Sequence, residues 1–196
     1  MSALSLKLLA VGVFFLLTQS SVLPPRSAQK TDNPNQFPEM LAVEGGFLAI
    51  DTPKDWVRAE GPGMAFFLRK GSTKATADVW IYISGFDLEP GDSTGSLQGL
   101  VRSDIQDFKK RFKNGTALEE RPFELPKVRA QAAVVTFRSG EEHNGFEQVM
   151  YIRESDRVLT LVLSAKTEQA FSKSLPVFQQ FAKSYGGMIV TASTQH

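Results

Sequence analysis

Three apolar segments separated by short turns constrain the fold of this chain more than any other feature. Segments 128–138, 146–154 and 157–165 are separated by only seven and two residues. A parallel pair of strands needs a crossover of about a dozen residues or more, so neighbouring segments must pair as antiparallel hairpins. The sequence therefore predicts an antiparallel sheet built around this region.

The last of these segments is apolar on both of its faces. In 157–165, Val158 and Val162 lie on one face, and Leu159, Leu161 and Leu163 lie on the other. An antiparallel strand with one wet face would alternate apolar and polar residues, which this one does not do. We therefore expect both faces of the sheet to be covered.

An amphipathic segment in the middle of the chain is predicted to supply the first cover. Apolar side chains in 96–113 follow helical spacing, and we expect Thr94 or Ser96 to cap the start of this helix. We expect Asn114-Gly115 to end it, because residues of this kind tolerate positive φ.

A second amphipathic segment, 167–187, is predicted to cover the other face. Pro176 lies in its middle and should break a single helix. We expect a short helical turn first and then a new helix that is capped by Ser174, with Pro176 in its first turn.

Further predicted strands complete an α+β domain. They are residues 47–51, 55–60, 64–70, 76–86 and 117–125. The last contains Pro122 and is expected at an edge. Together these elements predict an α/β/α sandwich on a central antiparallel sheet of about six strands. Trp56 begins one strand, and its large apolar area favours core packing over a role as a ligand platform.

The ends of the chain are predicted to lie outside this domain. Residues 1–20 have the pattern of a signal peptide, because Lys7 precedes ten apolar residues in a row, which is about half of the roughly 20 that span a bilayer. A buried core helix is the rival interpretation, and the N-terminal position argues against it. We expect 21–45 to be a flexible linker, 46–190 the folded domain and 191–196 a loose tail. The protein is then secreted or periplasmic.

Composition excludes several classes of function. The chain has no cysteine, which rules out disulfides, thiolate nucleophiles, cysteine-ligated metals and a lipidated cysteine. Loss of Lys7 with the signal peptide takes the formal net charge from +1 to 0. A neutral protein has no general attraction for nucleic acid, and we expect neither a nucleic-acid partner nor a stable membrane anchor after signal cleavage.

Two acidic groups are candidates for metal binding, and each has a plainer interpretation. Glu141, Glu142 and His143 are adjacent in a predicted turn, where side chains rarely converge on one ion. The stretch 87–92 contains Asp87, Glu89 and Asp92 but lacks the EF-hand pattern, so a plain acidic loop is favoured over a calcium site.

A basic group at the end of the first helix has two interpretations. Lys109, Lys110, Arg111 and Lys113 suit a solvated helix C-terminus, supported by a predicted Asp107–Arg111 pair, or a docking patch for an anionic partner. The first is favoured because no aromatic residues lie among them for stacking. Asn114-Gly115-Thr116 matches a glycosylation acceptor, which matters only in a eukaryotic secretory route. We predict no catalytic residue and no residue that binds a cofactor or metal.

Three stretches together resemble the PsbP/Mog1 family over residues 46–188. They are "FLAIDTPKDW" at 47–56, the amphipathic segment 96–113, and "VLTLVLSA" followed by Phe171, Ser174, Pro176, Phe178, Phe181 and Ser184. The resemblance implies an α/β/α fold and a mostly non-catalytic role. In that family, plant and cyanobacterial members attach to photosystem II, a fungal and animal member binds a small nuclear GTPase, and many bacterial members are exported. No functional residue of either partner-binding surface is matched here.

These observations predict an exported, non-enzymatic accessory domain of the cell envelope that contacts an unknown envelope protein. A carrier of lipid or small ligands is one alternative, and it requires a deep apolar cavity. An enzyme with an unrecognised site is the other, and it requires convergent polar side chains with shifted pKa values in a pocket.

Overall fold

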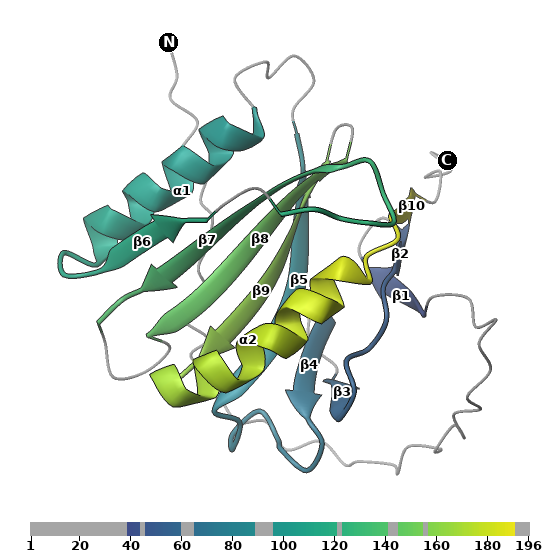
Figure 1. Ribbon diagram of the computed structural model, residues 1–196, viewed down its shortest axis with the longest axis horizontal. Helices are drawn as coiled ribbons and strands as arrows, with labels where there is room; N and C mark the ends of the chain where they lie inside the picture. Colours follow the sequence, from purple (N-terminus) through teal and green to yellow (C-terminus); the bar gives the residue numbers. More distant parts are fainter. Residues whose placement is uncertain are drawn as a thin grey trace, which may run out of the picture. The chain divides into compact units, whose positions relative to one another are not determined.

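A computed structural model describes residues 39–43, 46–59, 65–88, 96–120, 123–140, 145–154 and 157–190. The predicted signal peptide, nearly all of the predicted linker and the predicted C-terminal tail lie outside these ranges. The described chain forms one large sheet, one small sheet and two helices (Figure 1).

The large sheet has seven strands, all of them antiparallel to their neighbours, in the order β3-β4-β5-β9-β8-β7-β6. The strands are β3 (Trp56–Ala59), β4 (Ala65–Arg69), β5 (Val79–Asp87), β6 (Thr116–Glu119), β7 (Gln131–Arg138), β8 (Phe146–Glu154) and β9 (Arg157–Ala165). The predicted hairpins are confirmed as β7–β8 and β8–β9. The edge position predicted for 117–125 is confirmed for β6, which is the outermost strand.

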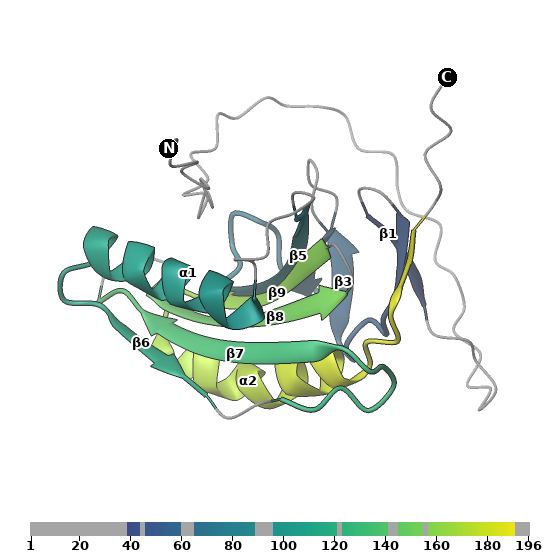
Figure 2. The same ribbon diagram turned by 90° about the horizontal axis from the view of Figure 1, so that it is seen from above.

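Two helices cover opposite faces of this sheet (Figure 2). Helix α1 (Leu97–Arg111) contacts β6, β7 and β8, and α2 (Glu168–Lys183) contacts β5, β8 and β9. On β9, Leu161 and Leu163 belong to the core beneath α2, whereas Val158 and Val162 belong to the core beneath α1. The predicted α/β/α sandwich with both faces covered is therefore confirmed.

The first helix begins as predicted but ends differently. Ser96 is its N-cap, and its side-chain oxygen accepts a hydrogen bond of 3.0 Å from the Gly99 amide. The helix ends at Arg111 with Phe112 as its C-cap, and Gly115, although it could tolerate a positive φ, does not adopt one. A Cβ at Gly115 would lie 2.7 Å from Cε1 of Phe108, so this position needs glycine because the Phe108 ring packs against its backbone.

The second helix is continuous, which corrects the predicted break at Pro176. Thr167 caps its start by accepting a bond of 3.1 Å from the Ala170 amide, so the predicted cap at Ser174 is also wrong. Ser174 instead donates to the Ala170 carbonyl at 2.7 Å within the helix. Pro176 is exposed, so the carbonyl that lacks a helical donor because of the proline faces water. The buried side chains of Phe171 and Phe178 hold the helix on the sheet.

A small three-stranded sheet lies beyond the β3 edge of the large sheet, away from α1 (Figures 1 and 2). It consists of β1 (Met40–Val43), β2 (Gly46–Ala49) and β10 (Met188–Val190) in the order β1-β2-β10. The predicted linker end at residue 45 is therefore too far along the chain, because Met40–Val43 pair with β2 and Leu41 is buried. The linker prediction missed β1, because this strand gains its hydrogen-bonding partner β2 only in the folded chain.

The interpretation of Trp56 as a core residue is confirmed. Its side chain is only 4% exposed and belongs to the core beneath α2. The Arg69 guanidinium lies 5.5 Å from its ring centroid, and Arg69 Nη2 also donates to Ser174 Oγ at 3.0 Å. The ring thus packs where the edge of the sheet meets α2.

Replacing Pro176 with alanine should stabilise the protein. Proline in a helix interior costs about 3 kcal/mol relative to alanine. The alanine variant has greater conformational freedom when unfolded, which offsets up to about 1 kcal/mol of the gain in stability. We expect the free energy of unfolding to rise by about 1–2 kcal/mol in chemical denaturation. Lys173→Ala, at another exposed position of α2, is the control and should change it by less than about 0.5 kcal/mol. A loss of stability in Pro176→Ala would show that the ring makes a contact that the helix needs.

Candidate functional site

Two features of the described chain are candidates for function, and the first is a cluster of polar side chains beneath α1. The Tyr151 hydroxyl on β8 donates a hydrogen bond to Asp104 Oδ2 on α1. Glu147, also on β8, lies directly across from Ser164 on β9, and Tyr82 approaches the same cluster from β5. We call Tyr82, Asp104, Glu147, Tyr151 and Ser164 the polar cluster.

The strand pattern explains why these residues meet. Side chains two residues apart on a strand share a face, so Glu147, Val149 and Tyr151 all point toward α1. Asp104 lies on the border of the helix's buried stripe, three residues after Val101 and four before Phe108. The helix therefore brings a carboxyl group to the part of β8 that carries another.

Burial shifts the acid–base properties of the cluster. It is the main cause of a raised pKa for Asp104, partly offset by the Tyr151 hydrogen bond and the positive charge of Arg111. Burial also raises the pKa of Glu147, and the negative charge of Asp104 adds to the effect. The pKa values of Tyr82 and Tyr151 lie far above the ordinary tyrosine value, again mainly because of burial, so both hydroxyls keep their protons.

One member of the cluster has unused hydrogen-bonding capacity. Ser164 is 1% exposed, and its Oγ has no partner within hydrogen-bond geometry. Its hydroxyl is nevertheless near enough to Glu147 to oppose the rise in that residue's pKa.

Sequence reasoning missed the polar cluster entirely. Its acids are single polar residues within apolar patterns, and only the packing of α1 on β8 brings them together. The cluster combines two carboxyl groups and three hydroxyls beneath a helix, with no histidine among them. These groups can hold protons and hydrogen bonds at the helix–sheet interface.

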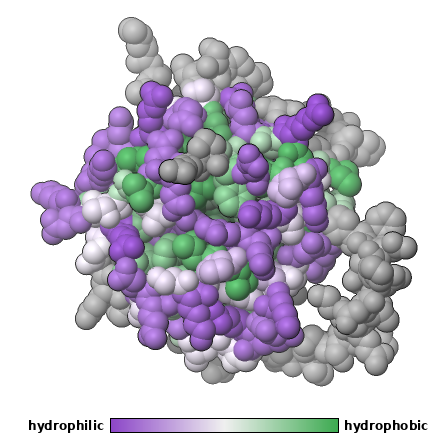
Figure 3. Space-filling view, viewed as in Figure 1, coloured by the Kyte–Doolittle hydropathy of each residue, from purple (hydrophilic) through white to green (hydrophobic). Residues whose placement is uncertain are grey.

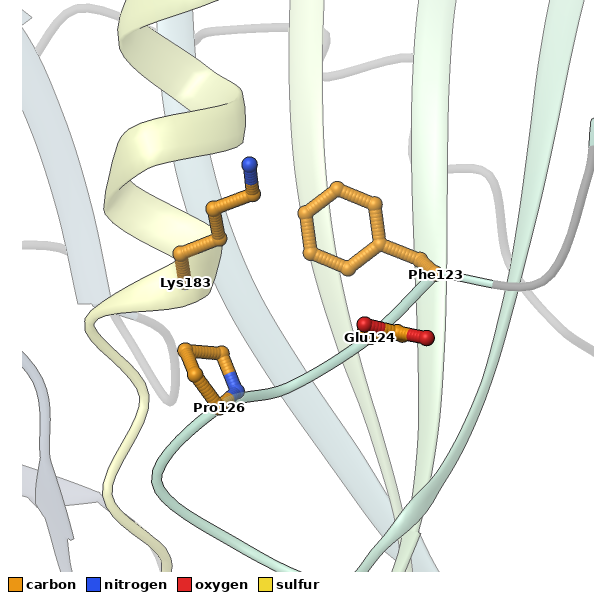
Figure 4. A pocket seen from close by; sticks show the side chains of 4 residues that line it. All are labelled: Phe123, Glu124, Pro126 and Lys183. Atoms are coloured by element: carbon orange, nitrogen blue, oxygen red, sulfur yellow. The ribbon is translucent and has the colours of Figure 1, made fainter.

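A pocket of about 380 Å³ lies elsewhere, beside the C-terminal end of α2 (Figure 4). Phe123, Glu124, Pro126 and Lys183 line it, and the Lys183 amine lies 5.8 Å from the Phe123 ring centroid. All of these residues except the half-buried Phe123 are exposed, so the pocket is open and two charged side chains border it. It differs from the deep apolar cavity that a lipid carrier requires.

The second candidate is an exposed apolar surface on the small sheet. Met40, Phe47 and Ile189 are 44%, 41% and 59% exposed, and Ala42 is exposed as well. We call these four residues the apolar patch. On the face of the molecule seen in Figure 3, hydrophobic residues reach the surface in several areas between hydrophilic ones.

The strand register places the members of the apolar patch side by side. Phe47 is directly opposite Ala42 on β1 and Ile189 on β10. Leu41 and Leu48 point to the other face of the small sheet, where both are buried. The small sheet therefore has one face packed on the core and one apolar face turned outward.

Of the metal-binding candidates identified in the sequence, only Asp87 lies among the described residues. Asp87 accepts a hydrogen bond from Arg157, which lowers its pKa, while Glu89, Asp92, Glu141, Glu142 and His143 lie outside the described residues. Among the residues that are described, no three or more His, Cys, Asp or Glu side chains are placed to hold a metal ion. No described helix is long and apolar enough to cross a membrane.

The basic residues at the C-terminal end of α1 are exposed, as a solvated helix end requires. They are Lys109, Lys110, Arg111 and Lys113. Asp107 pairs with Lys110 at 2.8 Å rather than with Arg111 as predicted. The Arg111 guanidinium instead lies 5.7 Å from the ring centroid of Phe112. Asn114 and Thr116 of the predicted glycosylation acceptor are exposed as well.

Comparison with known proteins finds similar solved structures but neither a matching family model nor a matching curated protein. Cyanobacterial PsbP (CyanoP) from Synechocystis sp. PCC 6803 matches at a TM-score of 0.49 and 13% identity, over 83% of this chain and 98% of that one. A Pseudomonas aeruginosa protein of unknown function, described as a putative regulator, matches at 0.47 and 15%, over 81% and 100%. A point mutant of Mog1 matches at 0.42 and 12%, over 74% and 86%.

Two of these structures are named PsbP and Mog1. Both names belong to the family that the sequence resembles. At these identities the likeness concerns the arrangement of helices and strands, and the choice of a functional surface depends on the residues described above.

Removing the Tyr151 hydroxyl should weaken the helix–sheet interface. In Tyr151→Phe the half-buried Asp104 loses its donor, and because water can partly replace it we expect a cost of about 1 kcal/mol. Tyr82→Phe is the matched control, because Asp104 accepts from Tyr151 and not from Tyr82. We expect chemical denaturation to show the larger loss in Tyr151→Phe, whereas equal losses would mean that Asp104 does not depend on this bond.

Proposed function

We propose that this chain is an exported, non-enzymatic accessory domain of the cell envelope that works through protein–protein contact at the apolar patch. The observation that carries the proposal is the outward apolar face formed by Met40, Ala42, Phe47 and Ile189. The signal-peptide pattern of residues 1–20 supports export.

The composition of the apolar patch favours a protein partner. The solvent face of an antiparallel sheet normally carries polar residues, which keep it in water. Here neighbouring strands place Phe47 beside Ile189 on the open face. A contiguous apolar surface of this kind marks a contact site, and aromatic side chains contribute strongly to the centres of protein interfaces.

The patch is also held in place before any partner arrives. The Ile50 amide donates to the Glu39 carbonyl at 3.0 Å, and the Ala49 amide donates to the Gly187 carbonyl at 3.0 Å. The Met188 amide donates to Glu154 Oε2 at 3.1 Å, which ties β10 to the end of β8. A surface that is already ordered loses less conformational entropy on binding.

Close backbone packing fixes the spacing of the patch. A Cβ on Gly46 would lie 2.2 Å from the Ile189 carbonyl oxygen, so only glycine lets β10 approach β2 at this point. The Arg58 guanidinium reaches from β3 to the Ala42 carbonyl at 3.2 Å. The three strands that carry the patch are therefore positioned by both sheets.

Polar substitution of the patch should abolish partner binding and spare the fold. Phe47→Ser with Ile189→Ser removes the two largest neighbouring apolar side chains, and we expect at least a tenfold loss in affinity, which is about 1.4 kcal/mol. The assay is capture from the native envelope with the mature protein as bait, followed by titration of the recovered protein. Leu118→Ser is the matched control, because Leu118 is 65% exposed on β6 and lies outside the patch. Equal recovery by the double variant and the wild type would contradict the proposal.

Export is tested separately. The full chain should be recovered from the envelope or medium with residues 1–20 removed, which N-terminal sequencing would show. Lys7→Glu combined with Leu16→Arg disrupts both the charge and the apolar run, and we expect the uncleaved precursor to remain in the cytoplasm. An uncleaved wild-type protein in the cytoplasm would contradict export without bearing on the apolar patch.

A further inference from the structure

We propose that the polar cluster is a proton-operated latch, which keeps α1 docked on the large sheet while Asp104 and Glu147 hold protons and loosens α1 when they release them. This adds a pH-dependent step to the fold and does not depend on the proposed function. Its basis is the position of two carboxyl groups beneath α1, one on the helix and one on a strand that the helix covers.

The geometry places the cluster where it controls docking of the helix. Asp104 belongs to α1, while Glu147 and Tyr151 belong to β8, so the Tyr151–Asp104 hydrogen bond joins the helix to the sheet. Among the described residues it is the one side-chain hydrogen bond between α1 and the strands beneath it. The other contacts of α1 with the sheet are apolar, through residues such as Val101 and Phe108.

The charged and titratable groups that face the two acids come from several elements. Helix α1 contributes Asp107, which raises the pKa of Asp104, and Arg111, which lowers the pKa of both acids. Strand β8 contributes Tyr151, and β5 contributes Tyr82. On the same face of the sheet β8 also carries Arg153 and β6 carries the exposed Glu119, while Ala117, Ala133, Val135 and Phe137 of β6 and β7 are apolar. Arg111 is the cation whose charge opposes proton uptake by both acids.

The direction of the effect follows from proton linkage. With α1 docked, burial raises the pKa of Glu147 and of Asp104, whereas both carboxyls return to ordinary values once the helix leaves. The docked state thus holds more protons above pH ~4, and docking weakens as the pH rises toward the raised values. Each proton involved changes the ratio of docked to released helix by up to about tenfold per pH unit.

Helix α2 provides an internal comparison within the same chain. Its interface with the sheet is the apolar core that includes Phe171, Phe178 and Phe181. On that face of the sheet a carboxyl does occur at Glu120, but it accepts from Thr136 Oγ1 and from Gln148 Nε2 at 2.8 Å. Its contacts are with β7 and β8 rather than with α2. The carboxyl that joins α2 to the sheet, Glu168, is exposed and pairs with Arg138 of β7 at 2.7 Å, so release of α2 uncovers no buried carboxyl.

The test is backbone hydrogen exchange of the full mature protein between pH 5 and 8, followed by mass spectrometry and corrected for intrinsic exchange rates. We expect α1 amides to be less protected than α2 amides, because α1 opens locally. Glu147→Gln keeps the shape of a protonated carboxyl, so it should raise α1 protection at least tenfold more at pH 8 than at pH 5. Glu120→Gln, the same change on the other face, should leave this pH dependence as in the wild type.

Two further variants separate a proton latch from a merely structural role. Asp104→Asn retains an acceptor for Tyr151 and should reduce the pH dependence as Glu147→Gln does. Arg111→Gln removes the positive charge that lowers the pKa of both acids, so the loss of α1 protection should continue to higher pH. A substitution that only loosened packing would change protection by the same factor at every pH.

Two outcomes would overturn the latch. One is equal protection of α1 and α2 with a common pH dependence, which would mean that α1 leaves only when the whole domain unfolds. The other is a pH-independent effect of Glu147→Gln. Addition of 5 mM calcium chloride at pH 8 tests for a cation site instead. A calcium-dependent gain of α1 protection that Glu147→Gln abolishes would mean that a cation, and not a proton, occupies the polar cluster.

Discussion

The burial of β9 on both faces is the constraint on which the rest of the structure depends. Leu161 and Leu163 point toward α2, while Val158 and Val162 point toward α1. A strand that is apolar on both sides is most stable when both sides are removed from water, so both helices contribute to the stability of the sheet. Since α1 and α2 lie over different groups of strands, each also determines which polar residues of the sheet are buried.

Local features were predictable from the sequence, because their causes lie within a few residues. The hairpins follow from turn length, and Ser96 caps α1 with its own side chain. The small sheet was not predictable in this way, because its strands have three or four residues and β10 pairs with a segment about 140 positions earlier. The continuity of α2 through Pro176 likewise depends on tertiary packing, which overrides local propensity.

The polar cluster illustrates a second limit of sequence reasoning. Asp104 is at the edge of an apolar helical stripe, where an acidic residue usually reaches water. Glu147 is near the start of a strand, and Ser164 on the next strand does not indicate that Glu147 will be buried. Each residue is ordinary in its own segment, and the desolvation that raises their pKa values exists only once α1 lies on β8. Periodicity identifies the covered face but not which polar side chains are trapped beneath it.

The two candidate sites share one physical property, which is that each departs from the most stable arrangement. Replacing buried ionisable groups with well-packed apolar side chains is often neutral or stabilising, so Asp104 and Glu147 do not make α1 bind as tightly as it could. Polar residues in place of Phe47 and Ile189 would likewise suit an open sheet face better. Departures of this kind concentrate where a protein does something besides fold. The polar cluster lies beneath α1 on the central strands β5, β9 and β8 of the large sheet, while the apolar patch lies on the small sheet. Strand β8 connects them, because the Met188 amide of β10 donates to Glu154 at the end of the strand that carries Glu147 and Tyr151.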